Sequence, residues 1–160
     1  MASVRQAAID AIIVKLGNIT TANGYTFDVT SDRVYRQADN PVTMPTPAVV
    51  VIQGEENIEN VYSDRYECSL EVIIGFVDQY NGNDPEARAN LFLADIQKAM
   101  GTEYMVTATP YGSSESGTTT INMLEEGNTI TVTDALPGYI LGQANYELRY
   151  RRHLLDPNKA

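Results

Sequence analysis

Residues 66–78 read YECSLEVIIGFVD, and every even position from Tyr66 to Phe76 carries an apolar side chain. Glu67, Ser69 and Glu71 lie between the first of these apolar positions. Successive side chains of a β-strand point to opposite faces, so one face of this segment is buried and the first half of the other is exposed to water. The alternation predicts a long β-strand.

Two other segments extend this pattern to a sheet. Residues 48–52 read AVVVI, a continuous and mostly β-branched run that is typical of a strand covered on both faces, so we place it in the middle of the sheet. Residues 140–154 alternate in the same way as residues 66–76 and predict the last strand. The three prolines between Asn40 and Pro47 predict a surface loop ahead of the first of these strands.

A hairpin is predicted between the second helical pattern and the last strand. Residues 121–126 and 128–136 flank Gly127-Asn128, a dipeptide that is typical of tight turns. Pro137-Gly138 predicts the next turn. We therefore expect two short strands here, joined at Gly127.

Two amphipathic helices are predicted. Ser3 followed by Gln6 matches a capping box, and apolar residues recur at helical spacing over 3–16. Asp84-Pro85-Glu86 combines an N-cap, a first-turn proline and an acid that suits the helix dipole, which predicts a helix over 85–100. Helices, strands and hairpins in this order predict a single α+β domain spanning 1–160, with a mainly antiparallel (mixed) β-sheet and two α-helices packed on one face.

Composition restricts the function. The 160 residues include 43% hydrophobic residues and carry a formal net charge of -10, which disfavours a general nucleic-acid binder with a basic face. The longest clean apolar run is far shorter than the roughly 20 residues of a membrane-spanning helix. We expect no membrane association and no signal peptide, and we expect synthesis in the cytoplasm.

The sequence contains no recognisable catalytic or cofactor motif. One cysteine and one histidine exclude Cys-rich and His-rich metal sites. Cys68 lies on the apolar phase of its strand and is interpreted as a packed side chain, while His153 is interpreted as a solvated residue at a strand end. Residues 78–84 fit a turn ending in a helix cap better than a calcium loop, because Tyr80 and Gly82 occupy ligand positions. We therefore expect a protein that is not an enzyme, with no metal and no cofactor.

Two oppositely charged segments remain. Residues 54–64 carry Glu55, Glu56, Glu59 and Asp64 and predict an acidic hairpin tip or projecting loop, whereas the end of the chain carries Arg149, Arg151, Arg152 and Lys159. Either set can be read as solvated strand ends. We expect the opposite charges to lie at two different places on one subunit, and a head-to-tail ring would give this separation a use, because each subunit presents one surface to a different surface of its neighbour.

A third feature is the polar stretch from 110 to 120, which is rich in Gly, Ser and Thr. Such a stretch cannot bury enough apolar surface to become ordered alone. We therefore expect the loop at 110–118, with Ser113, Ser114 and Gly117, to be disordered in the free subunit and ordered in the assembled structure.

In order, length and pattern, the chain resembles bacteriophage tail terminator (tail completion) proteins. The segments that carry the resemblance are the helix with Ile9, Ile12, Ile13 and Leu16, then Arg33-Val34-Tyr35-Arg36, Pro47-Ala48-Val49-Val50-Val51, Gly54-Glu55-Glu56, Glu71-Val72-Ile73-Ile74-Gly75-Phe76-Val77, the helix from Ala89 to Met100, and Tyr146-Glu147-Leu148-Arg149-Tyr150-Arg151. They cover nearly the whole chain, without a diagnostic motif.

The resemblance implies a structural virion protein that forms a homohexameric ring. Such a ring caps the finished tail tube, stops the addition of tube subunits and provides the face that joins the head. Its implied partners are copies of itself, the tail tube protein and a head-completion or neck protein, and DNA only passes through the lumen. We expect Arg149 and Arg151 at the subunit interface, and Glu55, Glu56, Glu59 and Asp64 either lining an acidic lumen or facing the tube.

Two other functions stay open. Another ring of the neck or tail, either a head-side joining protein or the tube subunit itself, fits the same pattern. A small α+β ligand-binding or catalytic module uses a similar scaffold but needs a concave pocket with convergent polar groups.

Overall fold

The computed structural model describes residues 3–37, 44–101, 103–108, 117–132 and 136–153, with only the backbone described for 103–108 and 117–120. Its main element is a six-stranded sheet in the order β3-β4-β5-β8-β7-β6. The strands are β3 (Val34–Arg36), β4 (Ala48–Val61), β5 (Arg65–Gln79), β8 (Tyr139–His153), β7 (Gly117–Val132) and β6 (Glu103–Ala108). Only the β3–β4 pair is parallel, so the sheet is mainly antiparallel, as predicted.

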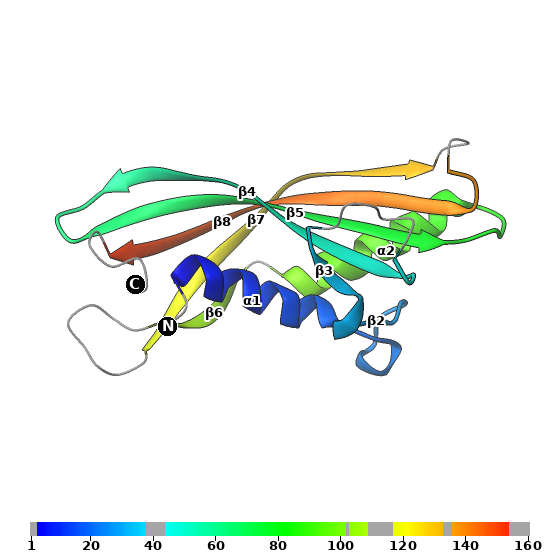
Figure 1. Cartoon of the computed structure of the whole chain (residues 1–160), viewed down its shortest axis with the longest axis horizontal. Coiled ribbons are helices and arrows are strands. Elements are labelled where there is room, and N and C mark those ends of the chain that lie inside the picture. The colour runs from blue at the N-terminus through cyan, green and yellow to red at the C-terminus, as the bar shows by residue number, and fades with distance from the viewer. Residues whose placement is uncertain (1–2, 38–43, 102, 109–116, 133–135, 154–160) are drawn as a thin grey trace.

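Two helices cover one face of this sheet (Figure 1), and the expected α+β class is confirmed. Helix α1 (Val4–Gly17) begins at Ser3, whose hydroxyl accepts a hydrogen bond from the Gln6 backbone N–H at 3.1 Å. Helix α2 (Pro85–Met100) begins at Asp84, whose carboxylate accepts from the Ala87 N–H at 3.0 Å. Both caps were predicted from the sequence, because each satisfies a backbone donor that the first helical turn leaves free.

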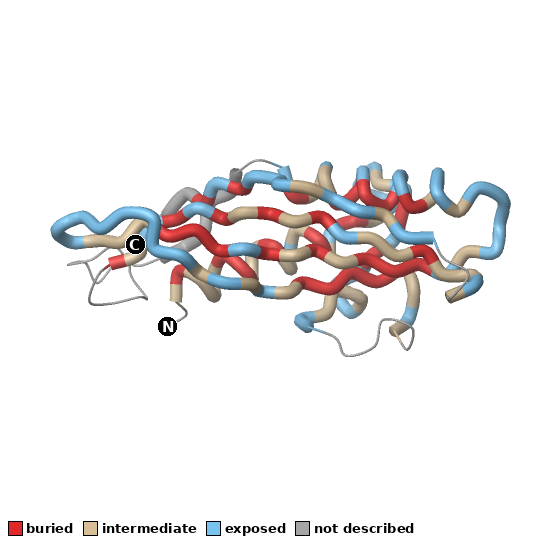
Figure 2. Tube along the Cα trace, turned by 90° about the horizontal axis from the view of Figure 1, so that it is seen from above, coloured by how far each residue is buried: buried red, intermediate tan, exposed pale blue. Residues whose placement is uncertain are grey.

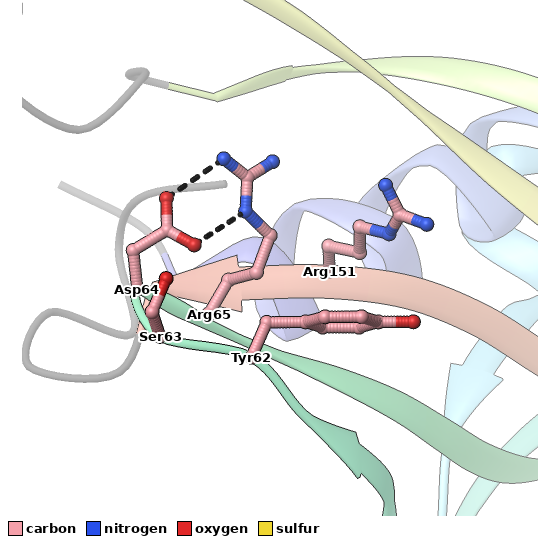
Figure 3. Close-up of a pocket in the computed structure, with 5 residues that line it drawn as sticks. All are labelled: Tyr62, Ser63, Asp64, Arg65 and Arg151. Atoms are coloured by element: carbon pink, nitrogen blue, oxygen red, sulfur yellow. Dashed lines mark hydrogen bonds and ion pairs between the residues drawn. The ribbon is translucent and has the colours of Figure 1, made fainter.

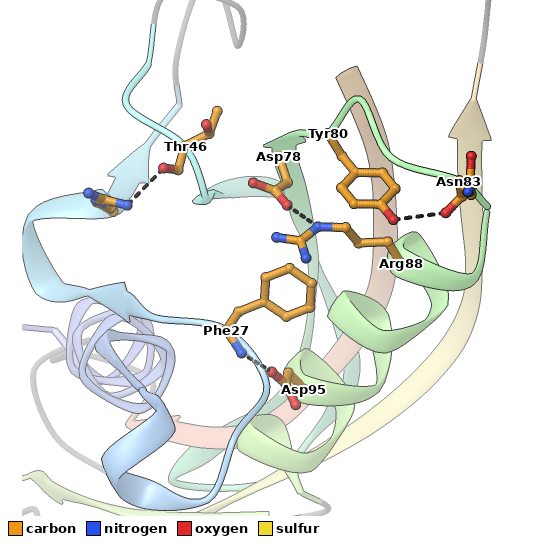
Figure 4. A network of polar contacts seen from close by, with 8 residues as sticks. Phe27, Thr46, Asp78, Tyr80, Asn83, Arg88 and Asp95 are labelled. Atoms are coloured by element: carbon orange, nitrogen blue, oxygen red, sulfur yellow. Dashed lines mark hydrogen bonds and ion pairs between the residues drawn. The ribbon is translucent and has the colours of Figure 1, made fainter. Parts of the chain in front are cut away.

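Small elements connect α1 to the sheet. Strands β1 (Asn18–Ile19) and β2 (Val29–Thr30) form a two-stranded antiparallel sheet, and two 3-10 turns lie at Thr21–Asn23 and Ser31–Arg33. The Asp95 carboxylate on α2 accepts a hydrogen bond from the Thr26 backbone N–H at 2.7 Å and one from the Phe27 backbone N–H at 2.9 Å, the second of which is drawn in Figure 4. A buried helix residue thus fixes the segment between the two small strands.

The core lies between the sheet and the helices, and Figure 2 shows buried residues along the long strands, whereas one end of the molecule is mostly exposed. The even residues of β5 and β8 face the helices, as the alternation predicted. The Phe92 ring of α2 stacks on Phe27 at 4.4 Å between centroids and meets Phe76 of β5 at 4.8 Å. The largest fully buried side chains are those of Tyr146, Phe92, Ile9, Ile12, Leu16, Ile19, Leu70, Ile74, Ile96, Met100, Ile121 and Met123.

The rim of this core is held by Arg88 of α2. Its guanidinium lies 4.7 Å from the centroid of the Phe27 ring and 4.9 Å from that of Tyr80. Its Nε donates to the buried Asp78 carboxylate at 2.7 Å (Figure 4). Pairing a buried carboxylate in this way avoids the large cost of an isolated buried charge. Asp78 therefore lies in a structural ion pair, outside any calcium loop.

The segment 54–64 forms the end of the β4–β5 hairpin, which is one of its two expected forms, and it is not a projecting loop. β4 continues to Val61, and only residues 62–64 form the turn into β5. The predicted hairpin around Gly127-Asn128 is wrong. β7 passes through both residues as one strand, with an irregularity in its pairing with β8 between Glu125 and Gly127. An extra residue in one strand produces a β-bulge. Glycine is common at bulges as well as in tight turns, so the same dipeptide fits either structure.

Gly142 of β8 lies where β5, β8 and β7 pack closely. A Cβ added to Gly142 would lie 2.3 Å from Cζ of Phe76 and 2.8 Å from the Thr129 carbonyl oxygen, whereas one added to Gly127 meets nothing within 4 Å. We expect Gly142→Ala to lower the free energy of unfolding by about 1–3 kcal/mol through overpacking. Gly127→Ala should change it by less than about 0.5 kcal/mol. Urea unfolding measures both, and equal costs would contradict the packing described.

Candidate assembly surfaces

The charged residues singled out in the sequence gather at one end of the molecule, apart from Lys159, which lies outside the described residues. There the β4–β5 hairpin and the last residues of β8 lie side by side, beyond α1 along the long axis (Figure 1). β5 pairs with β8 from Arg65 opposite His153 to Gln79 opposite Tyr139, without a register shift. Since the acidic strand β4 flanks β5 on its other side, the acidic and basic segments are neighbours within one subunit. The expected separation of the two charges is wrong.

Glu56 illustrates this most clearly, because it faces the helix side of the sheet. Its carboxylate accepts a hydrogen bond from the Tyr150 hydroxyl and pairs with the Arg152 guanidinium, with Oε1 and Nη2 3.2 Å apart. The Glu56 and Arg152 side chains are only 16% and 19% exposed. Arg152 also lies over the Tyr66 ring, 4.9 Å from its centroid. Glu56 is therefore part of a largely buried polar cluster within its own subunit.

This polar cluster affects the ionisation of its neighbours. Burial, followed by the hydrogen bond to Glu56, raises the pKa of Tyr150 well above its ordinary value. Burial and the charge of Glu56 also raise the pKa of the Cys68 thiol. A buried thiol with a raised pKa is a poor nucleophile, which agrees with the interpretation of Cys68 as a packed side chain.

The opposite face of the same strands carries pairs that are more exposed. Arg149 pairs with Glu147, and Arg151 lies 3.6 Å from Glu67. Ser69 donates to the exposed Glu59 carboxylate at 2.7 Å. The two arginines expected at a subunit interface are thus accessible, and each has an acidic neighbour in its own subunit. Exposed pairs of this kind contribute little to stability, so they leave the arginines able to exchange partners.

Asp64 lies at the hairpin turn. Its carboxylate is bound by the Arg65 guanidinium through two contacts, at 3.1 and 2.9 Å (Figure 3). This hydrogen bonding lowers the pKa of Asp64. Tyr62, Ser63 and Arg151 complete an open cavity of about 290 Å³ around the pair. Because Asp64 and Arg65 neutralise each other, this cavity does not present the convergent unpaired groups of a ligand site.

Two sequence interpretations are corrected here. His153 is not a solvated residue: it is 4% exposed, at the last residue of β8, where it pairs with Arg65 of β5. Gly117 is not part of a loop either, since it is the first residue of β7 and pairs with Ala108 of β6. Ser113 and Ser114 lie outside the described residues. Within the described residues, no group of three His, Cys, Asp or Glu side chains is arranged to hold a metal ion.

The sequence interpretation did not anticipate the two sheet edges. β3 pairs only with Val49–Val51 of β4, and β6 pairs with β7 only as far as Asn122. In the described part of the chain, no strand flanks Glu55–Val61 of β4 or Met123–Val132 of β7 on the side away from the sheet. Ile58, Val61, Leu124 and Val132 on these edges are 49%, 66%, 46% and 46% exposed. Unpaired strand edges of this length are places where another chain can add a strand.

Comparison with known proteins gives no match: no model of a known protein family fits the chain, and no curated protein sequence matches it significantly. Neither described helix is long and apolar enough to cross a membrane.

The position of Glu56 leads to a stability prediction. Glu56→Ala leaves Arg152 and Tyr150 without their buried partner, so we expect it to lower the free energy of unfolding by about 1.5–3 kcal/mol. Glu55→Ala removes an adjacent exposed carboxylate and should cost less than about 0.5 kcal/mol. Chemical unfolding of the two variants checks this. A larger cost at Glu55 would contradict a stabilising role for the buried cluster.

Two buried tyrosines provide a second prediction. The Tyr146 hydroxyl is buried and has no hydrogen-bond partner within the described residues, whereas the Tyr150 hydroxyl donates to Glu56. Tyr150→Phe should therefore destabilise the protein by about 1–2 kcal/mol, and Tyr146→Phe should be neutral or stabilising. Burial raises the pKa of both tyrosine hydroxyls in the folded protein. Above about pH 10, the two tyrosines ionise in the unfolded chain but stay protonated in the folded protein, so the free energy of unfolding falls as the pH rises. Unfolding curves at about pH 7 and pH 11 measure both effects, and Tyr146→Phe should weaken the alkaline loss.

Proposed function

We propose that this chain is a tail terminator: a structural virion protein that closes the completed tail tube of a bacteriophage as a homohexameric ring and provides the interface to the head. The observation that carries the proposal is the pair of open strand edges on opposite sides of one sheet. A subunit with two unlike, mutually complementary surfaces assembles head to tail, and such contacts close into a ring when the rotation permits.

The strand directions support this mode of assembly. β4 is antiparallel to β5, β5 to β8 and β8 to β7, so the two open edges run in opposite directions. Copies related by rotation about a ring axis keep these directions. The β4 edge of one copy therefore meets the β7 edge of the next in the antiparallel sense, which continues the sheet without interruption. A ring closed in this way pairs the open edges of β4 and β7, which removes the liability that they present in a single subunit.

In such a ring, we place the helices outside and the uncovered face of the sheet toward the channel. This face carries Glu59, Glu67, Glu71 and Glu147 together with Arg149 and Arg151. Carboxylates outnumber guanidinium groups, so the channel would repel the phosphates of DNA that passes through it. Glu56 no longer belongs to this set. The tail tube protein and a head-completion or neck protein are the proposed partners, and no enzymatic activity is proposed.

A tube subunit or a head-side joining protein could use the same two edges. A tail terminator would form a single ring that ends a tube, whereas a tube subunit would polymerise into tubes by itself. The charged cavity at the hairpin turn does not support a ligand-binding module, because it is occupied by its own Asp64–Arg65 pair.

Val61 provides a test of edge pairing. The Tyr62 N–H donates to Arg65 across the turn at 2.8 Å, so the alternation of an antiparallel pair directs the N–H of Val61, opposite Tyr66, away from β5. Val61→Pro removes this outward donor with little effect on the hairpin itself. Val61→Ala removes the side chain and keeps the N–H.

With isolated tail tubes present, we expect electron micrographs to show the wild type and Val61→Ala as single rings at tube ends, and tube growth to stop. Val61→Pro should cap at least about tenfold fewer tubes. A wild-type protein that stays monomeric with tubes present, or that leaves tube length unchanged, would contradict the proposed function.

A further inference from the structure

The three irregularities in strand pairing at the open edges have a common chemistry. In β4, Gly54 and Glu55 lie opposite the single residue Glu71, and Glu59 is the extra residue between the Ile58–Cys68 and Asn60–Glu67 pairs. In β7, Glu126 is the extra residue between the Glu125–Tyr146 and Gly127–Asn145 pairs. Each bulge in the described sheet thus places a glutamate on an open edge, whereas the β5–β8 pair inside the sheet has none.

These three carboxylates are exposed and only weakly compensated. Within the described residues, no ion pair involves Glu55 or Glu126, and Glu59 accepts a hydrogen bond from Ser69. The nearby Arg149 and Arg151 already pair with Glu147 and Glu67. Glu125, next to Glu126, accepts hydrogen bonds from Gln97 and Asn128 and adds a further negative charge. Both edges are therefore negative.

Bulges and charges are the two means by which edge strands avoid pairing with other chains. Carboxylates brought together across a new strand pair would also repel each other. We propose that Glu55, Glu59 and Glu126 hold two copies of this chain apart, so that the β4 edge of one pairs with the β7 edge of the other only when these charges are screened or neutralised. This inference rests on the proposed ring and concerns the control of its assembly.

The consequence is that the subunit stays monomeric in dilute solution and pairs where cations are supplied, such as a basic surface that receives the ring. Screening is the simplest way to imitate such a surface. The Debye length falls from about 30 Å at 0.01 M salt to about 3 Å at 1 M, so repulsion between the edges is present at the first concentration and nearly absent at the second.

The experiment compares three full-length proteins by sedimentation velocity in sodium chloride at about 0.01 M and about 1 M. They are the wild type, the edge variant Glu55→Gln/Glu59→Gln/Glu126→Gln, and the control variant Asp28→Asn/Asp32→Asn/Glu86→Gln. Both variants lose the same formal charge, but Asp28, Asp32 and Glu86 are exposed residues away from the open edges, just before β2, in the 3-10 turn Ser31–Arg33 and on α2. Circular dichroism and thermal unfolding confirm that all three are folded.

At low salt, we expect the wild type and the control to be monomers and the edge variant to self-associate at a concentration at least about tenfold lower. At high salt, the three proteins should associate alike. Amide exchange should then slow at Glu55–Val61 and Met123–Val132 in the associated species. Association of both variants at low salt would show an effect of net charge alone and overturn the inference.

The inference also fails if the edge variant remains monomeric, if exchange slows elsewhere, or if the wild type already associates at low salt. Association of the wild type at low salt would leave the proposed ring and the proposed function uncontradicted. Conversely, an edge variant that grows into filaments of unlimited length would support the role of the three glutamates and contradict the closed ring of the proposed function.

Discussion

The pairing of β5 with β8 is the constraint on which the rest of the structure depends. Both strands have 15 residues and pair along their whole length in a single register. A shift of one residue would turn every inward side chain outward, so the buried residues of the two strands, from Cys68 to Phe76 and from Ile140 to Tyr150, fix each other's position. Both helices pack on the apolar face that this register creates.

The same register explains why one of four predicted acidic site residues behaves differently from the others. Tyr150 and Arg152 are placed by β8, and the first bulge of β4 then turns Glu56 toward them instead of toward solvent. Without the extra residue at Gly54-Glu55, the alternation of β4 would point Glu56 to the uncovered face. A bulge thus assigns one carboxylate to the interior and leaves its neighbour on the edge.

The sequence predicted the parts of the fold that depend on local chemistry. Alternation located β5 and β8, and the cap at Asp84 gave α2 its observed bounds. The prediction from sequence failed where long-range strand pairing overrides local preference. Gly127-Asn128 is a dipeptide typical of turns, yet β7 continues through it because β8 pairs with β7 on both sides of this dipeptide. The acidic run after Gly54 looked like a loop because strand alternation is obscured when two bulges interrupt it. The open edges were not predicted, since they depend on where β3 and β6 end.

The points at which β3 and β6 end also determine where the two open edges lie along the sheet. The open part of β4 lies beside Tyr66–Glu71 of β5, whereas the open part of β7 lies beside residues of β8 that face Leu70–Asp78 of β5. The two free edges are therefore offset along the strand direction. Each copy in a ring joined through these edges would be displaced along the strand direction by this offset. Such a ring of sheets closes only if the strands are tilted from the ring axis. The short lengths of β3 and β6 would then determine the tilt of the strands and, through it, the width of the channel.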